Sequence, residues 1–155
     1  MLRRLVHHGV LAIGVGAAML LMSLQGCTDV GNRIALFFDE RDIREAAQRY
    51  LDAEVRRDFR EAYACLAPSS VYMATQPGYE DYLREAEASS TRIVNYKIIE
   101  ISKLRDNHDR ETYPRIEKFV QVEVDVTVSF EDNKETVVVN YSLTFIKEGG
   151  KWYKG

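Results

Sequence analysis

The chain of 155 residues has few of the residue types that build metal and covalent-catalysis sites, with two cysteines, three histidines and three prolines. None of the cysteines and histidines has the spacing of a metal site, so we expect no metal and no cofactor. The sequence has no internal repeat and no low-complexity tract. Its basic residues form no cluster, and its net charge is −3. A modestly acidic chain of this kind is a poor binder of nucleic acid, and no nucleic-acid partner is expected.

A long hydrophobic run is also missing. The apolar stretch from Gly9 to Leu24 is shorter than the roughly 20 apolar residues that span a membrane, and it follows Arg3 and Arg4 in the order typical of a secretory signal. Its end, Leu24-Gln25-Gly26-Cys27, resembles the bacterial lipoprotein cleavage box. That resemblance implies cleavage before Cys27 and attachment of fatty acyl chains such as palmitate, which would anchor the protein to a membrane.

Two other interpretations of this segment stay open, an uncleaved membrane helix and ordinary cleavage that leaves Cys27 as a free thiol. Acylation places the protein in the bacterial cell envelope. In Gram-negative enteric bacteria, Asp directly after the lipidated cysteine favours retention in the inner membrane. Thr28 occupies that position here, so the expected location is the periplasmic face of the outer membrane if the source is Gram-negative.

The predicted organisation is a signal peptide over residues 1–26, a lipidated tether over 27–39 and a single α+β domain over 40–155. If Cys27 is acylated, Cys65 has no partner for a disulfide. We expect it to be buried as a small apolar residue.

Helical periodicity dominates the first half of the domain. Apolar residues from Ile43 to Val55 recur with helical spacing and predict a helix over 39–57, capped by Asp39 or Asp42. Asp58 begins a second helix that continues to about Leu66, and a third runs from about residue 78 to 89.

The second half alternates with period two. Residues 94–101 predict a strand with a bulge where the phase shifts at Ile99. Valines at even positions from 120 to 128 alternate with polar residues and give the clearest strand signal. A strand over 137–145 and a short one at Trp152-Tyr153 follow, after a charged loop at 105–115 and a turn at Gly149-Gly150. Helices followed by an antiparallel meander with one apolar face indicate an α+β fold.

This order of elements resembles the nuclear transport factor 2-like (cystatin-like) superfamily, in particular its small bacterial lipoproteins. The residues that carry the likeness are the Asp58-Phe59-Arg60-Glu61-Ala62-Tyr63 segment after the first helix and the terminal Gly149-Gly150-Lys151-Trp152-Tyr153-Lys154. The resemblance implies N-terminal helices packed on a strongly curved antiparallel sheet, often with a pocket at the open end. It also implies possible dimerisation through the outer sheet face, but no single activity.

The candidate pocket residues are Glu54, Tyr50, Tyr82 and Tyr141. Glu54 falls near the centre of the apolar face of the first helix, beside Tyr50, where an acid is costly unless it is paired. Its expected role is structural, through a pair with Arg57 or Arg60, and the alternative is a carboxylate at a pocket mouth. Tyr82 lies on the third helix, and Tyr141 is the polar residue on the inner face of the two best strands.

Because these inner faces are otherwise apolar, no catalytic residues are assigned. The sequence favours a non-catalytic binding or interaction module for an unidentified small ligand or envelope protein. The alternatives are a pocket enzyme of the isomerase or cyclase type and a structural assembly factor of the envelope.

Overall fold

The computed structural model describes residues 37–70 and 78–155, and residues 38–155 form one compact unit. The predicted signal peptide and Cys27 lie outside the described residues. Within the described ranges, none of the helices combines the length and hydrophobicity of a membrane-spanning segment.

Within the described residues, three helices precede the sheet. Residues 37–56 are helical, with Ile43, Ala47 and Leu51 fully buried at a spacing of four residues, as an amphipathic helix requires. Arg57 ends this helix in the left-handed conformation, at φ 56°. Helix α2 (Phe59–Ala64) follows, with the Asp58 carboxylate accepting a hydrogen bond from the Glu61 backbone N–H at 3.1 Å. Helix α4 (Tyr79–Ala88) begins after Gly78 and ends before Ser89. The predicted second and third helices are therefore confirmed.

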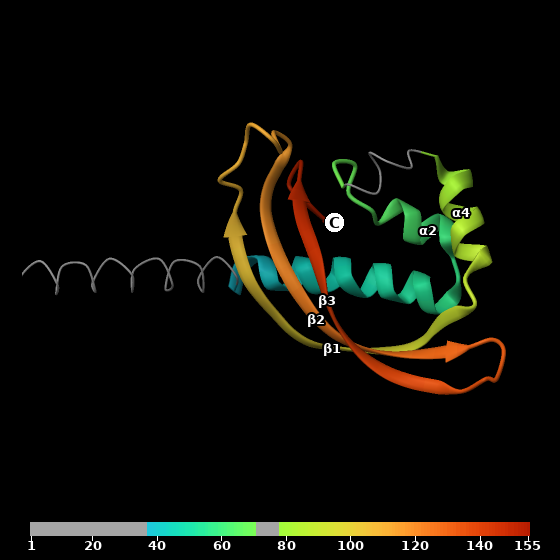
Figure 1. The fold of residues 1–155 in the computed structure, drawn as a ribbon. Helices are drawn as coiled ribbons and strands as arrows, with labels where there is room; N and C mark the ends of the chain where they lie inside the picture. Colours follow the sequence, from blue (N-terminus) through green and yellow to red (C-terminus); the bar gives the residue numbers. More distant parts are fainter. Residues whose placement is uncertain (1–36, 71–77) are drawn as a thin grey trace, which may run out of the picture. The chain divides into compact units, whose positions relative to one another are not determined.

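The sheet is an antiparallel meander in the order β1-β2-β3-β4. Its strands are β1 (Thr91–Asp106), β2 (Ile116–Phe130), β3 (Thr136–Glu148) and β4 (Lys151–Lys154). Gly149 and Gly150 form the last turn with φ values of 58° and 75°, which favour glycine. Figure 1 shows the long strands curving around the helix of residues 37–56, with α2 and α4 on the same side.

The curvature is accompanied by irregular pairing of β1. Its register to β2 shifts between Ile93 and Asn95, between Ile98 and Glu100, and between Ser102 and Arg105. Bulges of this kind bend a strand and increase its twist. The second shift coincides with the phase change that the sequence predicted at Ile99. In contrast, β2 and β3 pair without interruption from Lys118 and Lys147 to their far ends.

The hydrophobic core lies between the long helix and the concave face of the sheet. The inner face of β2 contributes Val120, Val122, Val124 and Val126, each at most 1% exposed, and β3 contributes Phe145. Tyr96 ties β1 to the helix, because its hydroxyl donates to the Asp52 carboxylate at 2.7 Å. Burial, and to a smaller extent the hydrogen bond to Asp52, raise the pKa of Tyr96 to about 12. The predicted α+β class, with helices packed on a curved antiparallel sheet, is confirmed.

The inner face is not buried along its whole length, which corrects one expectation. Tyr141, placed by alternation among the core residues, is 47% exposed, and Val137 and Phe130 at the β2–β3 hairpin are 42% and 36% exposed. These positions lie beyond the residues where β4 pairs with β3. Alternation identifies the face of a strand, but burial also needs a covering element.

Cys65 is buried, as the sequence predicted, and is a free thiol. It lies where the segment after α2 pairs with β4: the Lys154 N–H donates to the Cys65 carbonyl and the Ala67 N–H donates to the Lys154 carbonyl, both at 2.8 Å. Burial raises the pKa of the thiol. These bonds fasten the helical layer to the last strand.

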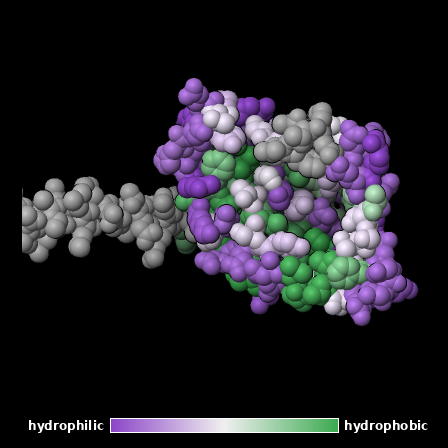
Figure 2. All heavy atoms as spheres, viewed as in Figure 1, coloured by the Kyte–Doolittle hydropathy of each residue, from purple (hydrophilic) through white to green (hydrophobic). Residues whose placement is uncertain are grey.

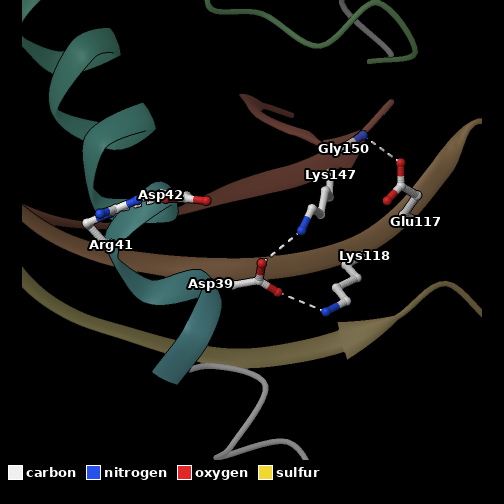
Figure 3. Close-up of polar contacts among 7 residues, drawn as sticks. All are labelled: Asp39, Arg41, Asp42, Glu117, Lys118, Lys147 and Gly150. Atoms are coloured by element: carbon white, nitrogen blue, oxygen red, sulfur yellow. Dashed lines mark hydrogen bonds and ion pairs between the residues drawn. The ribbon is translucent and has the colours of Figure 1, made fainter.

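Asp39 has a different role from the predicted helix cap. The chain is already helical at residue 37, and the Asp39 carboxylate instead binds two lysines of the sheet. Its two oxygens each lie 2.8 Å from an ammonium nitrogen, one of Lys118 on β2 and one of Lys147 on β3 (Figure 3). Burial opposes ionisation of this carboxyl, but the hydrogen bonds from the two lysines outweigh it and lower the pKa. We call these three residues the Asp39 clamp.

Candidate functional site

A cavity of about 580 Å³ opens between the helices and the far half of the sheet. Its walls come from the helix of residues 37–56, from the start of α2, from α4, and from β1, β2 and β3. The sheet supplies mainly aliphatic side chains: Ile93, Val124, Val126, Val128, Val137, Val139 and Leu143. The helices supply most of the polar groups. The cavity therefore has an apolar sheet wall and a mixed helical wall.

Hydrophobic residues continue from the cavity to the surface. Figure 2 shows a hydrophobic area at the lower right of the molecule, where Figure 1 places the β2–β3 hairpin. Phe130 and Val137 line the cavity and are exposed, and the neighbouring Val138 is 63% exposed.

All four candidate pocket residues line this cavity: Tyr50, Glu54, Tyr82 and Tyr141. The Tyr82 hydroxyl of α4 donates a hydrogen bond to Oε1 of Glu54 at 3.2 Å. Tyr50 lies one helical turn before Glu54 on the same face. Tyr141 lines the cavity from β3 and is half exposed. The structure thus brings a carboxylate and two tyrosines together on the helical wall and places the third tyrosine on the sheet wall.

Glu54 influences two neighbouring titratable groups. Burial, and then the negative charge of Glu54, raise the pKa of Tyr50, so its hydroxyl keeps its proton at physiological pH. Burial lowers the pKa of Lys154 on β4, while the charge of Glu54 opposes this shift. Glu54 therefore contributes the negative electrostatic potential that both groups experience.

The expected partner of Glu54 is not the one found. Arg57 places its guanidinium 3.1 Å from the Glu131 carboxylate and 5.3 Å from the centre of the Phe59 ring. Among the residues that the structure describes, Glu54 forms no ion pair with Arg57 or Arg60. Because Arg57 adopts the left-handed conformation, the helix ends at this residue. The expected pair depended on regular helical spacing between Glu54 and the arginine three residues later, and that spacing does not continue through Arg57.

Sequence reasoning did not identify Lys154 as a neighbour of Glu54. The two residues are far apart in the chain, and β4 reaches the helical layer only through its pairing with Cys65 and Ala67. No local periodicity carries that information. The sequence signal that marked Glu54 as a candidate pocket residue was its position on an apolar helix face.

The convex face of the sheet is polar around Asn140 and Gln121. Asn140 on β3 donates to Glu123 at 3.1 Å and to Asp125 at 2.9 Å, and Ser142 and Lys103 both contact the Gln121 side chain. In the described ranges no three acidic, histidine or cysteine side chains are placed to hold a metal ion. Glu123 and Asp125 thus lie on the face opposite to the cavity, as alternation predicted.

No family model matches the chain, and no curated protein matches it. Among solved structures, the chain is similar to a ketosteroid isomerase-like protein from Erwinia carotovora atroseptica. The two are 17% identical, the TM-score is 0.48, and the alignment covers 75% of this chain and 90% of that one.

Proposed function

We propose that this chain is a lipid-anchored protein of the bacterial envelope whose domain binds a small amphipathic molecule without transforming it. The cell-envelope part of the proposal depends on the Leu24-Gln25-Gly26-Cys27 box and on the apolar signal before it. The binding part depends on the cavity.

The observation that carries the binding function is the composition of this cavity. Ligand sites in proteins are typically of roughly 300 to 1,000 Å³, with mostly apolar walls and a few polar groups that fix orientation. The cavity of about 580 Å³ fits this description, with valines on the sheet side and the Glu54–Tyr82 pair on the helical side.

The arrangement also indicates the chemistry of the ligand. The valine wall suits a hydrocarbon body, and exposed aliphatic residues such as Val137 at the cavity mouth would be covered by it. Glu54 can accept further hydrogen bonds, because a carboxylate has about four acceptor positions. A ligand with a hydroxyl or amine at one end would use them. The cavity lining also includes a second carboxylate, Glu85, and two arginines, Arg57 and Arg92.

A second function, proton transfer of the isomerase or cyclase type, is favoured by one observation. Glu54 is a carboxylate beside two tyrosine hydroxyls in a largely apolar cavity, and the Tyr50 hydroxyl stays protonated. A carboxylate can act as a base and a tyrosine hydroxyl can stabilise a developing oxyanion. The binding proposal is preferred because the cavity wall formed by β2 and β3 is aliphatic apart from Phe130 and Tyr141, and the other ionisable group that the sheet contributes to the cavity is Arg92 on β1.

The test uses the mature chain with Cys27 replaced by Ser, purified without detergent, and the fluorescent apolar amine N-phenyl-1-naphthylamine. We expect saturable binding with one site per chain. Val139→Glu, on the cavity wall, should weaken binding at least tenfold, while Val138→Glu on the adjacent outer position should not. Equal effects of the two substitutions, or no saturable binding, would contradict the proposal.

A further inference from the structure

The two edges of the sheet are built differently. At one edge, β1 has three register shifts and carries charged residues along its length: Arg92, Lys97, Glu100, Lys103, Arg105 and Asp106. Bulges and charges are the devices by which natural sheets prevent their edges from pairing with another chain. The β1 edge is therefore protected.

At the other edge, β4 covers only part of β3. Its four residues pair with Phe145–Glu148, and the Gly155 N–H extends the pairing to the Thr144 carbonyl at 2.9 Å. In the described part of the chain, no backbone hydrogen bond continues this pairing over residues 136–143. The burial of β3 changes at the same place, from mostly buried over 145–148 to mostly exposed over 136–142.

This free segment has none of the protection seen on β1. Residues 136–143 read Thr-Val-Val-Val-Asn-Tyr-Ser-Leu, with no charged residue, no proline and no glycine. Their register to β2 is continuous, so no bulge twists the edge away. β-Branched and aromatic residues are those that favour strand pairing. An uncharged, regular edge of this length is a template for another strand.

The backbone groups that face outward can be assigned. The Thr144 carbonyl points toward β4, and antiparallel strands alternate the side to which both backbone groups of a residue point. The N–H and C=O groups of Val138, Asn140 and Ser142 therefore face the free edge. In residues 37–70 and 78–155 these groups have no backbone partner, so water or an added strand can supply one.

The geometry points to a second copy of this chain as that added strand, paired antiparallel with β3 over residues 136–143 about a twofold axis near Asn140. Two copies can pair about a twofold axis because the free edge of β3 offers the same alternating backbone donors and acceptors in each copy. No like charges would meet across the axis, because the segment is uncharged. The sheet would then continue through both copies.

Such pairing would also affect the cavity. Val137, Val139 and Tyr141 line it from the free edge, and Val137 and Tyr141 are among the exposed large hydrophobic residues. A second β3 beside them would extend the sheet wall and cover the exposed side. The inference stands on the edge alone and does not need the ligand-binding proposal.

The experiment uses the full chain in bacterial membranes and a short thiol-specific bismaleimide. Paired strands lie about 5 Å apart, so Asn140→Cys should give a cross-linked species of twice the chain mass. The matched control is Thr127→Cys, which lies one strand further in on the outer face, and it should not cross-link. The unsubstituted chain measures any background from Cys27 and Cys65.

Adding Val138→Pro to Asn140→Cys removes an outward N–H and leaves the pairing with β2 intact, because proline is tolerated on sheet edges. The cross-linked yield should fall at least tenfold at equal abundance and protease resistance. If this variant does not accumulate, Val138→Lys replaces it, because lysine is one of the residues by which natural edge strands avoid pairing with another chain. No cross-link at Asn140→Cys, a cross-link at Thr127→Cys instead, or a product with another protein would each overturn the inference.

Discussion

The contact between Glu54 and Tyr82 gives the most informative substitution, Glu54→Gln. Oε1 of Glu54 accepts from the Tyr82 hydroxyl at 3.2 Å, a long bond for a hydroxyl donor. A hydrogen bond to a charged group contributes about 1.5 to 3 kcal/mol, and one between neutral groups about 0.5 to 1.5 kcal/mol. Glutamine keeps the acceptor oxygen and loses the charge, so the expected loss is about 1 kcal/mol.

Two further effects act in opposite directions. Removing the charge relieves the desolvation of a half-buried carboxylate, and it also removes the attraction to Lys154. We therefore expect the melting temperature of the mature Cys27→Ser chain to fall by about 3 to 5 °C, the shift that 1 kcal/mol produces in a domain of this size.

A double-mutant cycle with Tyr82→Phe isolates the contact. Phenylalanine keeps the ring that packs 5.4 Å from the Tyr63 ring and removes only the hydroxyl. Urea denaturation of the four proteins should give a coupling free energy of about 1 kcal/mol, as for residues in direct contact. Strictly additive effects would refute the argument that Tyr82 is the partner of Glu54.

The same substitution separates binding from catalysis. If Glu54 positions a ligand, Glu54→Gln should weaken binding and keep cellular function in proportion to the remaining affinity. If Glu54 is a catalytic base, the variant should be as stable as the wild type or more stable, since active-site acids often cost stability. Such a variant would also fail to complement a deletion strain, and that combination would refute the non-catalytic proposal.

Three other predictions concern the core, the Asp39 clamp and the anchor. Val124→Asp places an unpaired charge in the buried valine face and should unfold the domain, whereas Gln121→Asp on the outer face should change the melting temperature little; equal effects would contradict the assignment of the inner face. Asp39→Asn should lower the unfolding free energy at pH 7 by about 1 to 3 kcal/mol. The pKa of Asp39 in the folded protein lies below its usual 3.8. Its contribution to stability is therefore present above pH 3.8 and is lost as the pH falls from that value toward the folded pKa. If the unfolding free energies of the wild type and Asp39→Asn differ by the same amount at every acidic pH, the clamp is contradicted. Cys27→Ser should lose both palmitate labelling and membrane fractionation, and a variant that keeps both would exclude acylation at this residue.

Much of the fold follows from local pattern. Period-two alternation over residues 120–130 identified the inner face of β2, and Val120, Val122, Val124 and Val126 on it are buried. Asp58 marked the start of α2 because a carboxylate there satisfies a free backbone N–H. The position of Glu54 on an apolar helix face singled it out as a candidate pocket residue.

The remaining features depend on contacts between distant parts of the chain. Asp39 reads as a helix cap in sequence, yet its lysine partners are 79 and 108 residues away. Glu54 has Arg57 as a neighbour in sequence, but the helix ends at that residue and Tyr82 is the partner instead. Tyr141 has the right alternation for the core, and its exposure follows from where β4 stops. The periodicity of neighbouring residues cannot predict the partners of Asp39 and Glu54 or the exposure of Tyr141.

If the proposed lipid anchor holds the domain by its N-terminal side, the Asp39 clamp has a mechanical consequence. Tension that enters through the chain before residue 38 meets the clamp at the start of the described helix, where two ammonium groups connect it to β2 and β3. Pulling single molecules should show Asp39→Asn yielding at lower force, and an unchanged rupture force would contradict this load path. Tyr50 and Glu54 lie roughly 20 Å further along the helix, at 1.5 Å per residue. The load is thus transferred to the sheet before it reaches the cavity, so ligand affinity should be independent of strain on the tether.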